Sequence, residues 1–365
     1  QPQSRANQRL CILETVMKDL HIAGICGHFA FGEELFDGQT IKTKIIAGEL
    51  EKQLGADDVC CVDTYGGAKR LPLITPKYIG LFFKCKNIII LPAQNGLKLF
   101  VPLSVLLNIL FCRKLHYVVI GGWLAEYLNA HRLIARLLKR FDNIYVETST
   151  MKKALEKTGF KNVVVMPNCK ELKILDESSL QYKYSEPLKL CTFSRVMQQK
   201  GIEDAIYAVR AINEKYKRIV YCLDIYGQVD EKQQTWFNSL QKSFPDYINY
   251  KGSVMFEKSV ETLKDYFALL FPTHYYTEGI PGTIIDAFSS GLPVIASRWE
   301  SFNDIIDDGI TGIGYRFSDK EALKNVLLDI VEKKEIVTGI KKNCISRAAD
   351  YLPSNVIQIL IKRML

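Results

Sequence analysis

Residues 278–296 decide the fold, and they read Glu278-Gly-Ile-Pro-Gly-Thr-Ile-Ile-Asp286-Ala-Phe-Ser-Ser-Gly-Leu-Pro-Val-Ile-Ala296. A buried apolar run over 268–273 precedes this stretch and predicts a strand that ends in a loop. Gly279 and Gly282 permit close backbone approach, and a helix is expected to start at Gly282 or Thr283. The unpaired N–H groups of its first turn, with the positive end of the helix dipole, favour an anion. Taken alone, glycines beside a helix start favour mere tight packing.

The two acids of this stretch flank the predicted anion site. Glu278 precedes it, and Asp286 lies beyond it, one turn inside the helix, on the face that can look back toward a ligand. A sugar nucleotide presents sugar hydroxyls, a diphosphate and ribose hydroxyls in that order, which matches the pattern. His274 lies in the loop before Glu278, where it can touch the donor sugar, although a lone histidine is more often only a structural residue. Solvated caps are the alternative interpretation of the two acids.

On both sides of this stretch, short apolar runs alternate with amphipathic ones, which is typical of βα units around a parallel sheet. The alternation stops at a polar stretch from Asp176 to Pro187 that is typical of a linker, and then resumes. We therefore expect an α/β fold with two doubly wound, Rossmann-like domains, 17–183 and 184–350, that face each other across a ligand-binding cleft. The expected strands are 21–26, 58–63, 87–91, 116–120, 143–147, 162–166, 188–193, 219–226, 247–251, 268–271, 293–296 and 312–315, and the expected helices are 38–54, 124–140, 149–158, 201–214, 230–243, 257–264, 282–290 and 319–333.

Two short segments stand outside these domains. Residues 1–16 differ in pattern from the rest of the chain, and we expect them to be an extension to a fold that starts near Met17. Residues 351–365 are expected to form a helix that crosses back to the first domain.

A second motif lies at Phe193-Ser-Arg195-Val-Met-Gln-Gln-Lys200-Gly201. A predicted strand ends just before Arg195, and Lys200 stands at the start of the next helix. One guanidinium and one ammonium at the same strand end can neutralise a diphosphate as it leaves. The alternative interpretation is an ordinary surface pair.

In the first domain, Gly38, Gln39 and Thr40 open a helix after a glycine-containing loop. The loop is neither G-x-G-x-x-G nor a Walker sequence, so dinucleotide redox chemistry and nucleotide hydrolysis lose support. Trp123 comes after the strand at 116–120, where its ring can stack on a sugar or serve as a core or rim aromatic.

The motifs together resemble retaining glycosyltransferases of family 4 (glycosyl transferases group 1), which have the GT-B fold. The stretch from Glu278 to Asp286 resembles the family's E-x7-E region, with Asp in place of the second Glu, and 291–296 is similar to its G-x-P-V-I/V-A/G run. The resemblance implies that Arg195 and Lys200 contact the donor phosphates. It also implies that Glu278 orients the donor sugar.

The same resemblance assigns roles to the remaining candidates. It implies that Asp286 holds the ribose and that the segment at Gly38, Gln39 and Thr40 approaches the donor diphosphate. Gly279, Gly282 and Thr283 are then donor ligands, His274 is a contact of the donor sugar, and Trp123 is a contact of the acceptor. The implied reaction moves a sugar from a nucleotide-diphosphate sugar, with UDP favoured over GDP, to an acceptor hydroxyl with retention.

Composition and charge limit the partners. A chain of 365 residues with 48% hydrophobic and 24% charged residues is not disordered or fibrous. Residues 1–185 hold 25 basic and 17 acidic side chains, whereas 186–365 hold 23 of each, so the net charge of +8 lies in the first half. Solubility explains such a charge, and so does an anionic partner.

A membrane surface is one such anionic partner. Arg132, Arg136, Lys139 and Arg140 interleave with leucines, which is typical of a helix that lies on an anionic bilayer and equally of a helix with a solvated basic face. The apolar stretch 99–112 is interrupted and too short to span a bilayer, so no spanning helix is expected. No nucleic-acid recognition motif occurs.

The ten cysteines form no C-x-x-C pair, which argues against zinc ribbons and dithiol redox sites. No D-x-D pair stands at a strand end, so no essential metal and no cofactor is expected beside the donor. We expect a cytoplasmic hexosyltransferase, peripheral on the inner face of the cell membrane, that builds polysaccharide on a lipid-linked acceptor. A sugar-nucleotide epimerase of the same fold and a non-catalytic scaffold are the rival interpretations.

Overall fold

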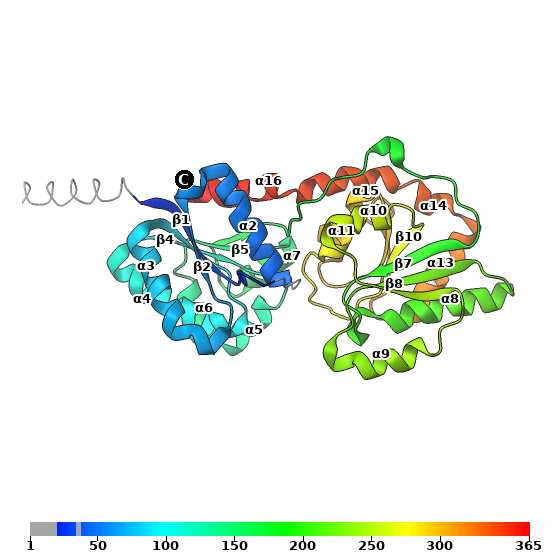
Figure 1. The fold of residues 1–365 in the computed structure, drawn as a ribbon, viewed down its shortest axis with the longest axis horizontal. Coiled ribbons are helices and arrows are strands. Elements are labelled where there is room, and N and C mark those ends of the chain that lie inside the picture. Colours follow the sequence, from blue (N-terminus) through cyan, green and yellow to red (C-terminus); the bar gives the residue numbers. More distant parts are fainter. Residues whose placement is uncertain (1–19, 34–37) are drawn as a thin grey trace, which may run out of the picture. The chain divides into compact units, whose positions relative to one another are not determined.

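The structure, a computed structural model, describes residues 20–33 and 38–365. The extension expected at residues 1–16 lies outside these described residues. The chain forms two compact units: residues up to Cys169 together with Pro353–Leu365, and Lys170–Leu352. Each unit contains one parallel six-stranded sheet with helices on both faces (Figure 1), so the predicted α/β fold with two doubly wound domains is confirmed.

The sheet of the first unit has the order β2-β1-β3-β4-β5-β6. Its strands read as continuous apolar runs because both faces of a parallel sheet are buried. In β3 (Cys85–Ile90), for example, Ile88 and Ile90 face one apolar core, whereas Ile89 faces the core on the other side of the sheet. The six strands are β1 His21–Gly27, β2 Val59–Asp63, β3 Cys85–Ile90, β4 Lys114–Val118, β5 Asn143–Val146 and β6 Val163–Val165.

The helices of the first unit separate into two layers, and α3 and α4 lie on the opposite side of the sheet from α2 and α16 (Figure 1). The chain returns to this unit at residue 353, where Val356, Ile357 and Leu360 fill the core beside β1 and α2. The helices are α2 Gly38–Leu54, α3 Leu71–Lys84, α4 Gln94–Phe111, α5 Leu124–Ala130, α6 Arg132–Leu138, α7 Ser149–Lys157, α16 Pro353–Val356 and α17 Gln358–Met364.

The sheet of the second unit has the order β12-β11-β10-β7-β8-β9. The chain therefore builds outward from β7 through β8 to β9, and then starts again on the other side of β7 with β10. The boundary between β7 and β10 is a topological switch point, where ligands bind in open α/β sheets. The strands are β7 Leu188–Phe193, β8 Tyr221–Tyr226, β9 Ile248–Gly252, β10 Ala268–Phe271, β11 Val294–Ser297 and β12 Gly312–Tyr315.

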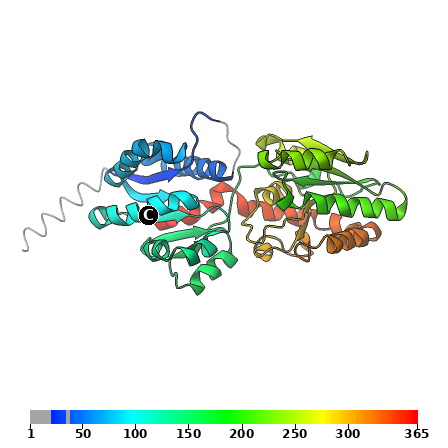
Figure 2. The same cartoon turned by 90° about the horizontal axis from the view of Figure 1, so that it is seen from below.

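The helices that come after β7 and β10 cover opposite faces of this sheet. Helix α8 packs with α9 and α13 over one face, and α11 packs with α10 and α15 over the other (Figures 1 and 2). The two loops at the switch point therefore diverge. The helices are α8 Ile202–Tyr216, α9 Gln234–Gln241, α10 Ser259–Leu263, α11 Gly282–Ser289, α12 Phe302–Ile305, α13 Lys320–Glu332, α14 Glu335–Thr338 and α15 Lys341–Ala348.

The second unit begins earlier in the chain than the linker pattern predicts. Leu172 and Ile174 pack on its core, and Leu175 N–H donates to Ser289 O at 2.8 Å. Residues 170–183, which we assigned to the first domain, thus lie on the second unit. Leu172 and Ile174, two positions apart, hold the start of this segment in place, and its only regular element is a short 3-10 helix at Glu177–Ser179.

The single helix predicted over 124–140 is wrong, because the structure breaks it at His131. The ring Nδ1 of His131 lies 2.9 Å from Tyr127 O, and the His131 N–H bonds Leu128 O instead. The side chain has thus taken the carbonyl that the helix would use. The rings of His131 and Tyr127 also stack, with centroids 4.0 Å apart.

Candidate functional site

The switch point of the second unit brings together two loops that carry charged side chains. Arg195 and Lys200 come after β7, and Glu278 comes after β10. Because β7 and β10 are adjacent and parallel, their carboxyl ends lie side by side and present these loops at the same edge of the sheet.

Lys200 and Glu278 form a direct ion pair. The Lys200 Nζ lies 2.8 Å from Glu278 Oε1 and 3.0 Å from Oε2, and Thr273 Oγ1 donates to Oε2 at 3.3 Å. The two charged side chains are only 15% and 16% exposed, so water screens their attraction weakly. A carboxylate has about four lone-pair sites, so Glu278 keeps the capacity to accept a hydrogen bond from a ligand hydroxyl.

Two aromatic rings lie beside the Lys200 ammonium. The Nζ is 5.6 Å from the ring centre of Phe271 and 5.1 Å from that of Tyr275. Rings at this distance attract a cation, and they limit the number of directions in which the ammonium can turn. Lys200 is therefore oriented before any ligand arrives.

Two glycines allow the strand-end loops to touch through their backbones. Gly201 has φ +69°, and a Cβ there would lie 1.9 Å from the carbonyl oxygen of Pro272, directly after β10. Gly227 has φ +131°, and its Cβ would lie 1.8 Å from the carbonyl oxygen of Ser194. No other residue fits at either position, so the positions of Lys200 and Arg195 depend on these glycines.

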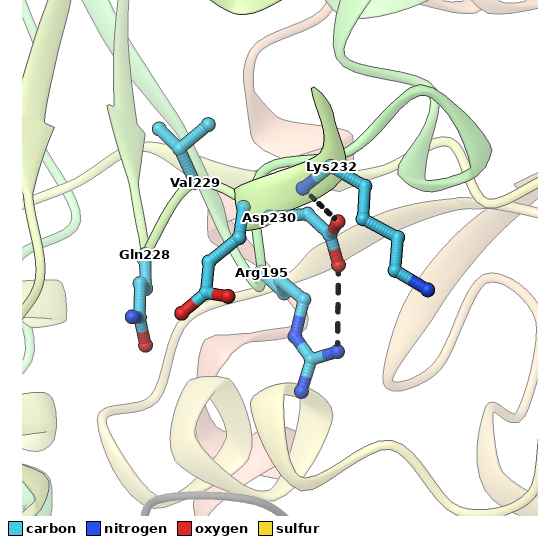
Figure 3. A pocket seen from close by; sticks show the side chains of 6 residues that line it. Arg195, Gln228, Val229, Asp230 and Lys232 are labelled. Carbon is cyan, nitrogen blue, oxygen red and sulfur yellow. Dashed lines mark hydrogen bonds and ion pairs between the residues drawn. The ribbon is translucent and has the colours of Figure 1, made fainter. Parts of the chain in front are cut away.

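Arg195 lines a cavity of about 420 Å³ with Gln228, Val229, Asp230, Glu231 and Lys232 (Figure 3). Its Nη1 lies 3.7 Å from Asp230 Oδ2, and the Arg195 side chain is 55% exposed. Figure 3 shows Asp230 held on its other side by the backbone N–H of Lys232, at 3.1 Å. An exposed guanidinium in a weak ion pair can turn to an anionic ligand at little cost.

The start of α11 lies at the position where the sequence predicts an anion site. Gly279 lies in the loop before it, Pro281 caps it, and Gly282 and Thr283 form its first turn. The Thr283 hydroxyl oxygen is buried and has no hydrogen-bond partner within the described part of the chain. The helix start at Gly282 is thus as predicted, and its first turn offers N–H groups to an anion.

Asp286 makes contacts that the sequence did not suggest. Its two oxygens each lie 2.6 Å from Lys170 Nζ, and Ser259 Oγ donates to Oδ1 at 2.9 Å. Burial raises the pKa of this carboxyl group, whereas Lys170 and Ser259 act to lower it. In this arrangement Asp286 ties residue 170 to α11, and its predicted contact with a ribose stays a prediction.

His274 is also held by the protein. Its Nε2 lies 2.7 Å from Asp204 Oδ2 on α8, and its backbone N–H donates to Gln199 O at 2.9 Å. These contacts fasten the β10 loop to the segment that carries Lys200. The contact of His274 with a donor sugar stays a prediction.

This part of the chain matches a known family. The model of the family described as glycosyl transferases group 1 covers residues 177–348, which include Arg195, Lys200, Glu278 and the start of α11. We call residues 177–348 the group 1 segment after this match. Residues outside this group 1 segment, including the first unit and Lys170, are not covered by the family model.

Two curated relatives match at low identity. An uncharacterized glycosyltransferase of Methanocaldococcus jannaschii is 24% identical over 166 residues, which is 44% of this chain. The amylovoran biosynthesis glycosyltransferase AmsK of Erwinia amylovora is 24% identical over 159 residues, which is 42% of this chain. The matches span only 40% and 39% of the lengths of these relatives.

Solved structures match over both units. HepE of Anabaena, in complex with UDP and glucose, has a TM-score of 0.70 and 14% identity, and the match covers 93% of this chain and 98% of HepE. Sucrose-phosphate synthase of Thermosynechococcus elongatus has a TM-score of 0.72 and 15% identity, with 93% and 97% coverage. At such identity the likeness shows the fold, and that fold is GT-B.

In the first unit, outside the group 1 segment, Gly38, Gln39 and Thr40 open α2 as predicted. Gln39 Nε2 donates to Leu91 O at 3.2 Å, and the Thr40 hydroxyl lies 2.7 Å from His28 Nδ1. These contacts join the loops after β1 and β3, which flank the switch point of this sheet.

Trp123 precedes α5 in the same unit. Its ring Nε1 donates to Ile120 O at 2.8 Å, and its ring meets Tyr127 edge-on, with centroids 5.3 Å apart. These contacts fix a half-buried ring against the core. The contact of Trp123 with an acceptor stays a prediction.

The sequence did not predict an ion pair in the first unit or the role of a third charged residue there. Lys42 Nζ lies 2.6 Å from Glu147 Oε1 and 3.1 Å from Val119 O, and both side chains are buried. The available signal was the placement of Glu147 directly after an apolar strand. Asp63 was also missed, although it ends β2 in the same way.

Asp63 fixes the loop after β1. Its carboxylate accepts backbone N–H groups of Phe29, Ala30, Phe31 and Tyr65 at 2.9–3.2 Å. Burial acts to raise the pKa of Asp63, but the four donors outweigh it and leave the pKa lowered. The Asp63 charge therefore holds the loop that leads toward α2.

Within residues 20–33 and 38–365, no group of three or more His, Cys, Asp or Glu side chains is arranged to hold a metal ion. Asp308 of the acidic cluster 304–308 is engaged in a turn, where it accepts Gly314 N–H at 2.7 Å and pairs with Arg298.

Proposed function

We propose that this chain is a glycosyltransferase that moves a sugar from a nucleotide-diphosphate sugar to an acceptor hydroxyl. One observation carries the proposal: in the group 1 segment, Lys200 pairs with Glu278 at the switch point of the sheet. A cation and a carboxylate at one strand edge can serve a ligand that has both phosphates and hydroxyls.

The geometry suggests how the groups would act. Negative charge grows on the diphosphate as the sugar leaves, and Lys200, Arg195 and the α11 N–H groups would stabilise it. Glu278 would orient the donor sugar through its hydroxyls. These cations would neutralise the leaving group in place of a metal, and the acceptor would attack the face from which the diphosphate departs, with retention of configuration.

We infer that the donor is a UDP-sugar, of which a hexose is the expected sugar. Support comes from HepE, a structural neighbour whose crystals hold UDP and UDP-glucose. Further donor ligands in this proposal are Gly279, Gly282, Thr283, Asp286 and His274 in the second unit and Gly38, Gln39 and Thr40 in the first, with Trp123 as the acceptor contact.

We also propose that the acceptor is a lipid-linked glycan and that the chain acts in polysaccharide biosynthesis, as a cytoplasmic protein peripheral on the inner face of the cell membrane. The name of the relative AmsK, an amylovoran biosynthesis glycosyltransferase, supports the polysaccharide role. The excess of basic residues in the first half of the chain supports the membrane.

Thermal unfolding with UDP, GDP, UDP-glucose and uridine tests the donor site. A ligand at about 100 times its Kd adds about 2.7 kcal/mol of stability, so UDP and UDP-glucose should raise the melting temperature, with GDP and uridine weaker. Lys200→Ala should abolish the shift. Lys333→Ala, which removes an exposed lysine after α13, is the matched control and should keep it. A flat response to every nucleotide contradicts the assigned phosphate ligands.

Glu278→Gln separates an enzyme from a scaffold. The amide keeps the size of the side chain but loses the charge, so the release of UDP from UDP-glucose should fall strongly while UDP still binds. A scaffold would show no UDP release in the native chain either. A sugar-nucleotide epimerase would instead convert the donor sugar without releasing UDP.

A further inference from the structure

Three helices of the first unit expose large apolar side chains to solvent. On α4, Leu106, Ile109 and Leu110 are 64%, 68% and 80% exposed, and on the neighbouring helices Phe83 of α3 and Leu133 of α6 are 62% and 65% exposed. Single exposed leucines are ordinary, whereas a group of them marks a surface that another molecule covers.

These side chains come from one layer of the unit. Helix α4 packs against both α3 and α6 (Figure 1). The spacing of Leu106, Ile109 and Leu110 puts them on one side of the last turns of α4. At the same end, the rings of Phe83 and Phe111 meet edge-on with centroids 4.5 Å apart, which joins α3 to α4. We call the exposed surface of α3, α4 and α6 the apolar-basic face.

The other side of α4 is committed to the core. Leu97, Phe100 and Val101 are buried there, and Ser104 hydrogen-bonds Tyr78 of α3. By length and composition α4 is the one helix, among the described residues, that could cross a membrane, and 28% of it is buried. Because its inner side is packed on the sheet, only its outer side is offered to a partner.

The charge of this region selects the partner. Residues 64–141 contain twelve lysines and arginines but a single acidic residue, Glu126, and α3, α4 and α6 contain no acid at all. The exposed cations include Lys77 and Lys84 on α3 and Arg132 and Arg136 on α6. Apolar side chains rimmed by cations, without carboxylates, complement a bilayer with anionic headgroups.

We propose that the apolar-basic face docks on the surface of an anionic phospholipid bilayer. Leu106, Ile109 and Leu110 enter the interface between headgroups and acyl chains, and the lysines and arginines of α3 and α6 contact the headgroup phosphates. A second copy of the chain is the poorer occupant, because pairing this face with itself would bring like charges together. The purpose of docking, which is access to a lipid-linked acceptor, rests on the proposed function. Binding to the bilayer can be measured independently of that function.

Flotation of the full chain with vesicles tests the proposal. Vesicles of phosphatidylcholine with about one third phosphatidylglycerol should bind at least about tenfold more tightly than pure phosphatidylcholine, and high salt should weaken the binding. The triple variant Leu106→Ser, Ile109→Ser, Leu110→Ser should lose at least about tenfold in affinity. The matched control is Ile310→Ser in the second unit, where Ile310 is exposed outside the face, and it should bind like the native chain.

Separate variants test the charge of the apolar-basic face and the depth to which it enters the bilayer. Arg132→Glu with Arg136→Glu should lose binding to anionic vesicles, whereas Leu110→Trp should show a blue-shifted emission that bromine-labelled acyl chains quench. Native-like binding by the triple variant overturns the proposal, as does equal binding to both vesicle types. A dimer in solution that the triple variant abolishes, without vesicle binding, assigns the face to a second copy and also overturns it. UDP binding stays unchanged in all these variants, so failure here leaves the donor site intact.

Discussion

Removing Lys170 should destabilise the second unit through a charge left unpaired in its core. Asp286 has a 3% exposed side chain and receives both close contacts from the Lys170 ammonium, which is itself 14% exposed. Lys170→Met keeps the length of the side chain but leaves the carboxylate with Ser259 alone. Removing one partner of a buried ion pair costs about 3–5 kcal/mol of unfolding free energy. We expect a loss of about 3 kcal/mol because the hydrogen bond from Ser259 remains.

The matched variant is Asp286→Asn. The amide fills the same volume, and the lysine left behind is the more exposed partner and can reach water. Its cost should therefore be smaller, about 1–2 kcal/mol. The double variant Lys170→Met, Asp286→Asn should be more stable than Lys170→Met alone, because it holds no unpaired buried charge.

The pH dependence has a definite sign. Burial raises the pKa of Asp286 in the folded chain above its unfolded value, and loss of Lys170 raises the folded pKa further. An acid of this kind destabilises the fold when ionised, and the penalty disappears as the pH falls through the folded pKa. The difference in unfolding free energy between the native chain and Lys170→Met should therefore shrink as the pH falls from neutral toward acid.

Urea unfolding measured by tryptophan fluorescence gives these differences, since Trp236 and Trp299 both belong to the second unit. The reasoning is refuted if Lys170→Met costs less than about 1 kcal/mol, below any buried pair. It is also refuted if Asp286→Asn costs as much as Lys170→Met at neutral pH. Titration of Asp286→Asn with UDP and with inorganic pyrophosphate tests the predicted ribose contact. If Asp286 contacts the ribose, the variant should bind UDP more weakly but pyrophosphate as the native chain does. If its role is purely structural, the affinities for both ligands should change equally.

Three further outcomes are expected from the geometry. Gly201→Ala places an alanine in a left-handed backbone with its Cβ 1.9 Å from Pro272 O. The variant should therefore lose more unfolding free energy than the about 1–2 kcal/mol of backbone strain alone, and it should bind UDP weakly. The control Gly252→Ala, with φ +74° and open space around the Cβ, should show only the strain and keep its affinity for UDP. Burial lowers the pKa of Lys341 to about 8. The unfolding free energy of the native chain, measured with urea, should therefore rise from about pH 8 to about pH 10. An equal rise in Lys341→Met would contradict this prediction. Asp63→Asn should lower the unfolding free energy of the first unit by about 1–2 kcal/mol, because an amide accepts the backbone N–H groups more weakly. The fluorescence of Trp123, which belongs to the first unit, should then report unfolding at a lower urea concentration.

Much of the fold can be predicted from the sequence because strands buried on both faces are nearly continuous apolar runs. All twelve expected strands occur, and the helix starts at Gly38 and Gly282 are as predicted. Helices α3 and α4 were not predicted, since prolines at 76 and 102 interrupt their pattern. Packing on the sheet outweighs that local cost.

The candidate site divides in the same way. Arg195, Lys200 and Glu278 sit at strand ends, and strand ends can be predicted, so their meeting at one sheet edge could be expected. The contact between Lys170 and Asp286 joins residues 116 positions apart, and no local pattern encodes it. The break at His131 depends on one ring nitrogen taking a backbone carbonyl, which periodicity alone does not reveal.

The return of the chain to the first unit has a consequence for biosynthesis. Residues 353–365 supply Ile357, Leu360 and Ile361 to the core beside β1, yet they are translated after the whole second unit. As a nascent chain emerges from the ribosome, the second unit can therefore close while the first still waits for part of its interior. A released chain that ends at residue 352 should therefore show protease resistance in the second unit and not in the first.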